Sequence, residues 1–307
     1  MKHLFIINPA AGKKGSTDAL VEQIHTLFGE RGLAYEIAFT TQVGEAERIT
    51  HEAAEKGEEV RVYACGGDGT LCEVVNGAAG HDFMAVSNYP KGTGNDFLKI
   101  FGKDYRARFS DLEALAVGPQ AVFDLMDCNG KLGIGSICAG LDARVAADVH
   151  KYKGLPLISG IGAYILALIE NILFKGFSRP ATVEVEGSRI DGEVTILCVM
   201  NGRYYGGGFM PVGDAEPDDG VLDMLVVPGI GLFTFFRLVG EYAKGRYKKY
   251  PDLIRAFHGS GMTLSSPEGL VAVVDGEVMR SDHFSIRLSE RKVNFFYPGD
   301  LTYRAAP

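Results

Sequence analysis

Short apolar runs alternate with amphipathic helical patterns through the first 120 residues of this 307-residue chain. The apolar runs occupy residues 4–7, 34–40, 60–64 and 84–87, and the helical patterns occupy residues 18–31, 46–56 and 71–79. This alternation is typical of βαβ units, in which helices connect parallel strands. The sequence therefore predicts an α/β domain with a parallel sheet over residues 1–120.

The pattern changes after Gly118 and Pro119, where strand-like runs follow one another between Gly and Asp turns. These runs occupy residues 122–127, 181–186, 194–201, 222–227, 270–274 and 283–288. Two helical patterns interrupt them, at 159–174 and between 232 and 244. A chain of this length exceeds what one core usually supports. We therefore predict a second, β-rich domain over residues 121–290.

Composition excludes several classes of function. With 31 Lys and Arg against 39 Asp and Glu, the net charge of −8 disfavours wrapping nucleic acid, and we expect no nucleic-acid partner. Five scattered cysteines without a CxxC pair predict buried, reduced thiols. The first apolar run is too short for a signal peptide, and the longest uncharged stretch, 155–169, is too short to span a bilayer. A cytoplasmic protein is expected.

Three glycine-rich loops follow predicted strands of the first domain: residues 8–12 (NPAAG), 66–70 (GGDGT) and 91–96 (KGTGND). Because the carboxyl ends of parallel strands meet at one edge of a sheet, the loops should line one crevice. Their backbone N–H groups, with the helix N-terminus that follows Thr70, suit a polyanionic phosphate. The chain has neither a P-loop sequence nor GxGxxG before its first helix, which excludes P-loop enzymes and the standard dinucleotide fold.

Carboxylates lie in or beside two of the predicted turns. Asp68 inside a phosphate-binding loop would repel its ligand without a divalent cation, so the loop implies Mg²⁺. Asp275 and Glu277 follow the apolar run 270–274, which places two carboxylates at the end of a predicted strand. By position alone, Asp275-Gly276-Glu277 would form a hairpin turn more often than a catalytic site.

These motifs together resemble the catalytic domain of the diacylglycerol kinase family of lipid kinases. GGDGT is shared with NAD kinases, whereas GTGNDF at 92–97 favours the lipid kinases, with further matches at 206–209, 218–223 and 275–277. The resemblance implies an α/β nucleotide-binding domain followed by a β-sandwich, with a C-terminal segment of about 291–307 returning to the first domain. It also implies ATP- and Mg²⁺-dependent phosphorylation of diacylglycerol to phosphatidic acid.

The resemblance carries over to individual positions of this sequence. The ATP-contacting set is Asn8, Gly12, Thr40 (or its neighbour Thr41), Gly66, Gly67, Asp68, Gly69, Thr70, Thr93 and Asn95. A structural Mg²⁺ maps onto Glu216, Asp219 and the carbonyl of Val221, with Asp124 in the same network. The catalytic set is Glu277, Asp275 and Asp68, and Glu277 is favoured over Asp275 as the proton acceptor.

A lipid acceptor requires peripheral, transient contact with a membrane surface. The apolar stretch 155–174 and the segment 232–236 are candidates for that contact, followed by the basic residues Lys244, Arg246, Lys248, Lys249 and Arg255. The plainer interpretation is a core helix followed by a solvated basic stretch. The resemblance also implies a homodimer. Alternatives for function are a kinase for a sphingoid base or monoacylglycerol, an NAD kinase, or a non-catalytic nucleotide- or lipid-binding member of the fold.

Overall fold

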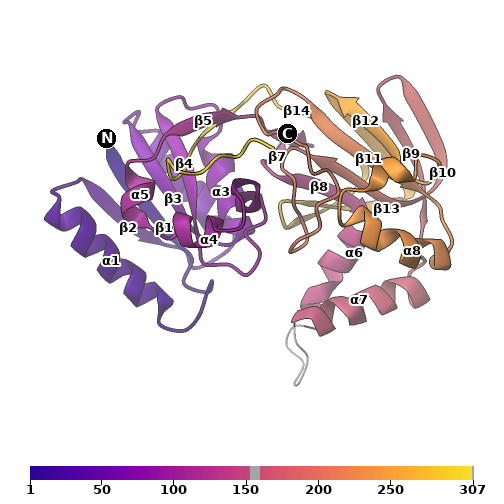
Figure 1. The fold of residues 1–307 in the computed structure, drawn as a ribbon, viewed down its shortest axis with the longest axis horizontal. Helices are drawn as coiled ribbons and strands as arrows, with labels where there is room; N and C mark the ends of the chain where they lie inside the picture. The colour runs from indigo at the N-terminus through magenta and orange to yellow at the C-terminus, as the bar shows by residue number, and fades with distance from the viewer. Residues whose placement is uncertain (153–159, 306–307) are drawn as a thin grey trace. The chain divides into compact units, whose positions relative to one another are not determined.

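The computed structural model describes residues 1–152 and 160–305, which form two compact units. Unit 1 comprises residues 1–125, 216–218 and 289–307, and unit 2 comprises residues 126–215 and 219–288. The predicted boundary at residue 120 falls within β5 (Gln120–Phe123), a strand of unit 1. The chain enters unit 2 after Leu125. Figure 1 traces both units along the chain.

Unit 1 contains a six-stranded sheet in the order β2-β1-β3-β4-β15-β5. Its members besides β5 are β1 (Lys2–Ile7), β2 (Tyr35–Phe39), β3 (Val60–Gly66), β4 (Met84–Pro90) and β15 (Val293–Phe296). The first four strands and β15 run parallel, and β5 runs antiparallel to β15. The helices α1 (Ser16–Glu30), α2 (Glu45–Ala54) and α3 (Asp68–Ala78) connect the parallel strands. The predicted α/β fold of this unit is confirmed.

Aromatic side chains close the core of unit 1 where its C-terminal strand is inserted. Phe295 of β15 packs on Phe97, Phe101 and Phe123, with ring centroids 5.4–6.1 Å apart. Phe97 and Phe101 bound a short 3₁₀ helix, η1 (Phe97–Phe101), which follows the third glycine-rich loop. This packing anchors the base of that loop to the sheet, because each of these rings is almost fully buried.

Unit 2 is built on a nine-stranded sheet in the order β12-β11-β10-β8-β13-β14-β6-β7, with β9 paired to both β10 and β13. The strands are β6 (Met126–Cys128), β7 (Lys131–Gly133), β8 (Ser136–Gly140), β9 (Arg179–Val185), β10 (Ser188–Met200), β11 (Leu222–Pro228), β12 (Arg255–Gly259), β13 (Gly261–Val274) and β14 (Glu277–Leu288). Every assigned strand pair in this sheet is antiparallel. The predicted β-rich second domain is confirmed.

One predicted strand, 122–127, is wrong. The chain there forms the end of β5 in unit 1 and the start of β6 in unit 2. The two strands are separated because the amide of Asp124 donates to the carbonyl of Pro217 (2.7 Å) instead of a sheet neighbour. The sequence shows one apolar run over 122–127 because β5 and β6 both contain buried apolar residues.

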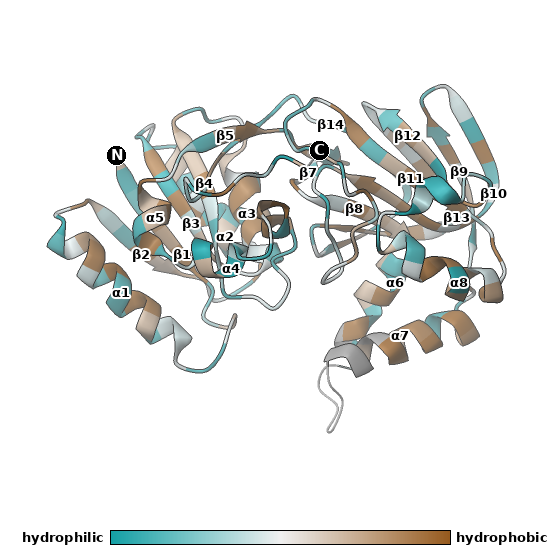
Figure 2. Cartoon of the chain, in the orientation of Figure 1, coloured by the Kyte–Doolittle hydropathy of each residue, from teal (hydrophilic) through white to brown (hydrophobic). Residues whose placement is uncertain are grey.

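Helices cover one face of the unit 2 sheet. They are α6 (Leu141–Asp148), α7 (Gly160–Phe174) and α8 (Leu232–Tyr242), and they share a core with Cys138, Cys198 and Leu225 of the strands. The opposite face of these strands contributes to a second core. Figure 2 shows apolar residues along α7 and α8. Residues 155–159 of the predicted apolar stretch, including the predicted helix start at 159, lie outside the described residues.

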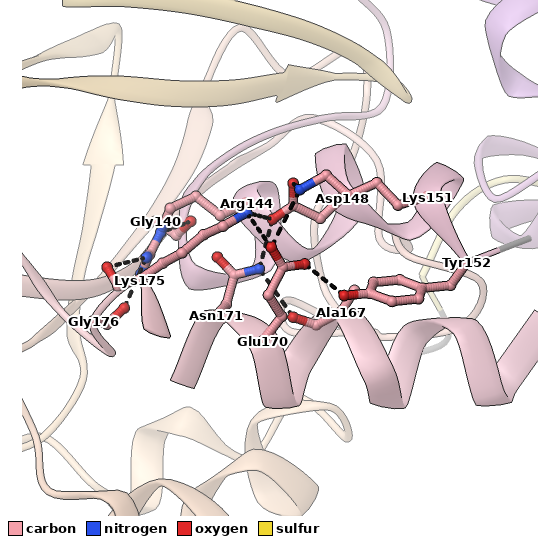
Figure 3. Close-up of polar contacts among 10 residues, drawn as sticks. All are labelled: Gly140, Arg144, Asp148, Lys151, Tyr152, Ala167, Glu170, Asn171, Lys175 and Gly176. Carbon is pink, nitrogen blue, oxygen red and sulfur yellow. Dashed lines mark hydrogen bonds and ion pairs between the residues drawn. The ribbon is translucent and has the colours of Figure 1, made fainter. Parts of the chain in front are cut away.

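A polar network joins α6 to α7 (Figure 3). Asp148 accepts a hydrogen bond from Asn171 (2.8 Å) and pairs with Lys175 (2.6 Å). Its pKa is lowered to about 2 because hydrogen bonds and charges from Lys151, Lys175 and Asn171 outweigh its desolvation by burial. None of the described helices has the length and apolar character needed to cross a bilayer. All five cysteines are buried and free, as predicted.

Candidate active site

The three glycine-rich loops of unit 1 follow β1, β3 and β4, which are neighbours in the sheet. We call residues 8–12 loop 1, 66–70 loop 2 and 91–96 loop 3. The amides of Lys91 and Gly92 donate to the carbonyl of Gly66 (3.0 and 3.1 Å), so loops 2 and 3 are in contact. A Cβ atom on Gly92 would lie 2.5 Å from the Cα of Gly67, so only glycine allows this approach.

The carboxylate of Asp68 holds loop 3. Its Oδ2 accepts from the amide of Asn95 (2.9 Å) and its Oδ1 from the amide of Asp96 (2.6 Å). Asp68 lies at the start of α3, so the same residue connects loop 2 to loop 3. This positioning role was not part of the sequence-based reasoning, which assigned Asp68 to the metal and the phosphate. That assignment stays a prediction.

Two asparagines of the predicted nucleotide set stabilise the loops from within. Asn95, fully buried with φ 51°, donates to the carbonyl of Gly66 (3.0 Å) and to Oδ1 of Asn88 (2.7 Å). Asn8 accepts from the amide of Ala10 (3.0 Å), which closes the turn of loop 1. These contacts fix the backbone that would face a phosphate.

The predicted threonines differ in setting. Thr40 is buried at the end of β2, where its amide donates to the carbonyl of Ile7 (3.0 Å). Thr41, the alternative, donates from both its amide and its hydroxyl to Glu45 (2.6 and 2.9 Å). Thr93, in loop 3, is exposed. Thr93 is therefore open to a ligand, whereas Thr40 is bonded to the end of β1 and Thr41 to Glu45 at the start of α2.

Lys91 is a site residue that sequence reasoning did not assign. Its side chain is buried, and its Nζ donates to the Thr17 hydroxyl (2.7 Å). Burial lowers the pKa of Lys91. A Cβ on Gly12 would lie 3.5 Å from the Lys91 Cε, so this cation lies beside loop 1. The signal in the sequence was a lysine at the head of a glycine-rich loop, where its charge complements phosphate.

In unit 2, Asp275 and Glu277 flank the turn between β13 and β14. The Asp275 carboxylate accepts from three successive amides, those of Ile134, Gly135 and Ser136 (2.6–3.1 Å). Burial nevertheless raises its pKa. Asp275 therefore fixes the segment between β7 and β8, which it reaches across about 140 residues of sequence.

Glu277 has a carboxylate oxygen available for chemistry. Its Oε2 pairs with Nζ of Lys131 (3.1 Å). Its Oε1 is buried and has no hydrogen-bond partner in the part of the chain that the structure describes. A buried acceptor without a partner is costly, and a substrate hydroxyl would satisfy it.

The predicted metal residues have other contacts. Glu216 pairs with Arg304 and accepts from the amide of Ala305, and Asp219 accepts from the amide of Val221 (3.0 Å). Asp124 is buried and pairs with Lys292 (2.7 Å). Across residues 1–152 and 160–305, no group of three His, Cys, Asp or Glu side chains is arranged to hold a metal ion. The Mg²⁺ site stays a prediction.

A partly buried polar chain in unit 2 was also missed. Asp142, the second residue of α6, accepts from the Tyr205 hydroxyl (3.0 Å), which also contacts the Tyr242 hydroxyl (3.2 Å). Tyr242 donates to the thiol of Cys198 (3.0 Å). Burial raises the pKa of Asp142 to about 6. No local motif marks this chain, because its members come from separate elements.

The two units match two protein families. Residues 2–128 match the diacylglycerol kinase catalytic domain, and residues 135–294 match the YegS C-terminal NAD kinase beta sandwich-like domain. The chain belongs to the YegS-like lipid kinase family. The resemblance drawn from the glycine-rich loops is therefore confirmed.

Similar proteins cover from about two thirds to almost all of the chain. A probable lipid kinase YegS-like of Enterobacter sp. (strain 638) is 27% identical over 97% of this chain and 96% of its own length. One from Pseudomonas putida is 31% identical over 68% of this chain and 70% of its own length. A crystal structure of a putative diacylglycerol kinase from Bacillus anthracis str. Sterne has a TM-score of 0.74 at 23% identity, covering 96% of each chain. That likeness shows the fold.

The unit 1 loops of this family member fit a nucleotide phosphate. Contact between Gly67 and Gly92 leaves backbone unshielded by side chains, Lys91 adds a buried cation, and α3 begins at loop 2. Amides at a helix N-terminus lack intrahelical acceptors, so they are available to an anion. The arrangement can therefore bind and orient a polyphosphate.

Proposed function

We propose that this chain transfers the γ-phosphate of ATP to the free hydroxyl of diacylglycerol, giving ADP and phosphatidic acid. The proposal assigns nucleotide binding to loops 1, 2 and 3 of unit 1, and proton acceptance to Glu277 of unit 2. The observation that carries it is the buried Oε1 of Glu277, an acceptor with no hydrogen-bond partner among the described residues. Membership of a lipid kinase family supports it.

In the proposed reaction, the acceptor oxygen bonds to the γ-phosphorus while the bond from that phosphorus to the β-bridging oxygen breaks. Glu277 accepts the hydroxyl proton, and Lys131 keeps the other carboxylate oxygen in place. The loop amides and Lys91 orient the phosphates. Mg²⁺, bound with ATP, would neutralise charge on the transferring phosphoryl group.

The acceptor is tested with radiolabelled ATP and purified full-length chain, using diacylglycerol, monoacylglycerol, sphingosine and NAD in separate mixed-micelle assays. We expect label in phosphatidic acid and at least tenfold less in the other products. Label in phosphorylated sphingosine or NADP would assign the alternative kinase. Absence of label in all four, from protein that binds ATP, would favour a non-catalytic role.

The base is tested by Glu277→Gln, which keeps shape and polarity but removes the proton acceptor. We expect kcat to fall by about 10²-fold or more while the KM for ATP changes little. Steady-state kinetics with varied ATP and varied diacylglycerol measure both constants.

Asp275→Asn is the matched comparison. Its amide group would face the N–H donors of residues 134–136, so we expect a lower melting temperature together with the loss of rate. Near wild-type turnover of Glu277→Gln, with a folded but inactive Asp275→Asn, would exchange the two roles.

We further propose that the chain meets its lipid through the exposed apolar faces of α7 and α8. The exposed residues are Ile165, Ile169, Leu173, Phe174, Leu232, Phe233 and Phe236. The first three recur every four residues, so they line one stripe of α7. The basic stretch contributes less, because Arg246 and Lys248 pair with Glu241 and Asp214.

Vesicle sedimentation tests this surface. Phe233→Asp, at a side chain that is 85% exposed, should weaken binding to vesicles of phosphatidylcholine and phosphatidylglycerol by about tenfold, because insertion of the ring is lost. Val43→Asp, at an 87% exposed apolar residue of unit 1, is the matched control and should bind as wild type. Equal binding of all three proteins would place the membrane contact elsewhere. The predicted homodimer stays a prediction.

A further inference from the structure

Two strands of unit 2 share the same pair of neighbours. β8 pairs with residues 196–200 of β10 and 272–274 of β13, whereas β9 pairs with residues 188–194 and 262–265 of the same two strands. The register shifts between Val194 and Ile196 in β10 and between Ser265 and Leu270 in β13. β8 and β9 therefore lie end to end, and the sheet is interrupted between them.

A cavity of about 490 Å³ lies at this interruption. It is bounded by the end of β8, the start of β9, and the irregular segments of β10 and β13. Its apolar lining includes Ala139, Ala181, Val194, Leu197, Leu264 and Leu270. The volume is within the range of about 300–1,000 Å³ for small-molecule sites, and the small alanine side chains leave the space.

Three arginines also line the cavity: Arg144, Arg179 and Arg280. Arg144 is 9% exposed and donates to backbone carbonyls, including those of Gly140 and Gly176 (Figure 3). Arg179 pairs with Glu268 (2.8 Å), the one carboxylate of the lining. Within the described parts of the chain, neither Arg144 nor Arg280 forms an ion pair, so the lining carries an excess of positive charge.

We propose that this cavity binds a single-chain amphiphile with an anionic head, a carboxylate or a phosphate. The apolar lining would take the acyl chain, since burial of methylene groups is favourable. Arginine is suited to both head groups, because its planar fork donates two parallel hydrogen bonds to either. The site lies wholly within unit 2 and involves none of the residues proposed for phosphoryl transfer.

Photolabelling with a diazirine-bearing palmitate tests the site in the full chain, below the critical micelle concentration and without nucleotide. We expect labelled peptides from β9 and from residues 264–271, found by mass spectrometry. The methyl ester of the same probe, which lacks the charge, should label these peptides at least tenfold less. A diazirine-bearing lysophosphatidate distinguishes a phosphate head from a carboxylate.

Two variants make the result decisive. Ala181→Leu fills the cavity and should abolish labelling, and Arg280→Ala, at an exposed side chain, should weaken it by about tenfold without unfolding the protein. Arg189→Ala, an arginine of β10 outside the cavity, is the control. Equal labelling by the ester, labelling of other peptides, or labelling unchanged in Arg280→Ala and Ala181→Leu would overturn the proposal. Because no ATP is present, these outcomes are independent of kinase activity.

Discussion

Asp142→Asn should change how the stability of unit 2 depends on pH. In the wild type, the Asp142 carboxylate accepts from the Tyr205 hydroxyl and the Ala143 amide (3.0 and 2.9 Å), yet burial raises its pKa to about 6. An asparagine keeps an acceptor for Ala143 and places an amide donor next to the Tyr205 hydroxyl, which can accept. The substitution therefore removes the charge with little change in shape.

The sign follows from the direction of the shift. At pH 4 and below, Asp142 is largely protonated in the folded state, and the desolvation of a charge is avoided. As pH rises through about 6, the folded state must ionise a buried group that the unfolded chain ionises freely, so stability is lost. A folded-state pKa of about 6, against about 4 in the unfolded chain, corresponds to a stability loss of about 3 kcal/mol on ionisation. The free energy of unfolding of Asp142→Asn should therefore exceed that of the wild type by an amount that grows from about pH 4 to about pH 6 and stays constant above that.

Urea denaturation followed by far-ultraviolet circular dichroism, from pH 4.5 to 8.5, measures this difference. Asp252→Asn, at an exposed aspartate, is the matched control and should follow the wild-type curve. A constant offset between Asp142→Asn and the wild type at every pH would refute the argument. It would mean that the carboxylate titrates alike in the folded and unfolded chains.

Two further predictions concern the loops of unit 1. Asp68→Ala removes the acceptor for the amides of Asn95 and Asp96. Turnover of the variant should fall below a tenth of wild type while its melting stays cooperative. Retained turnover, or slow hydrogen exchange at both amides in the variant, would contradict this. Gly92→Ala places a Cβ 2.5 Å from the Cα of Gly67, so the KM for ATP should rise at least tenfold in steady-state assays. Gly29→Ala, in open space on α1, is the control and should match wild type.

Strands β1, β3 and β4 were predictable because they are buried on both faces and appear as continuous apolar runs. The start of α3 was not. The prediction placed it at Leu71, whereas the helix begins at Asp68, because glycine at 69 disfavours a helix unless tertiary contacts hold the first turn. The hydrogen bonds that the Asp68 carboxylate accepts from the amides of loop 3 provide such contacts.

Unit 2 was less predictable, since its decisive contacts join residues far apart in sequence. The interaction of Asp275 with residues 134–136, the sharing of β10 and β13 by β8 and β9, and the chain from Asp142 to Cys198 have no local pattern. Their residue types, a carboxylate after a strand or a buried tyrosine, also occur in turns and ordinary cores. The sequence therefore placed the candidate base in the turn at residues 275–277, but the residues alone left both Asp275 and Glu277 as candidates.

In the structure, Asp275 and Glu277 differ in what they contact. Loop 3 and the segment after β7 both contain glycines and offer few side chains by which to hold their backbone. In each, an aspartate from elsewhere in its own unit accepts successive amides: Asp68 in loop 3 and Asp275 at residues 134–136. Such a carboxylate offsets the conformational entropy that glycine loses on ordering. Its oxygens are then engaged, whereas Glu277 retains a buried oxygen without a partner among the described residues. Loss of either aspartate should therefore loosen a loop, whereas loss of the glutamate should lower the rate of the proton transfer that we propose for it while both loops keep their hydrogen bonds.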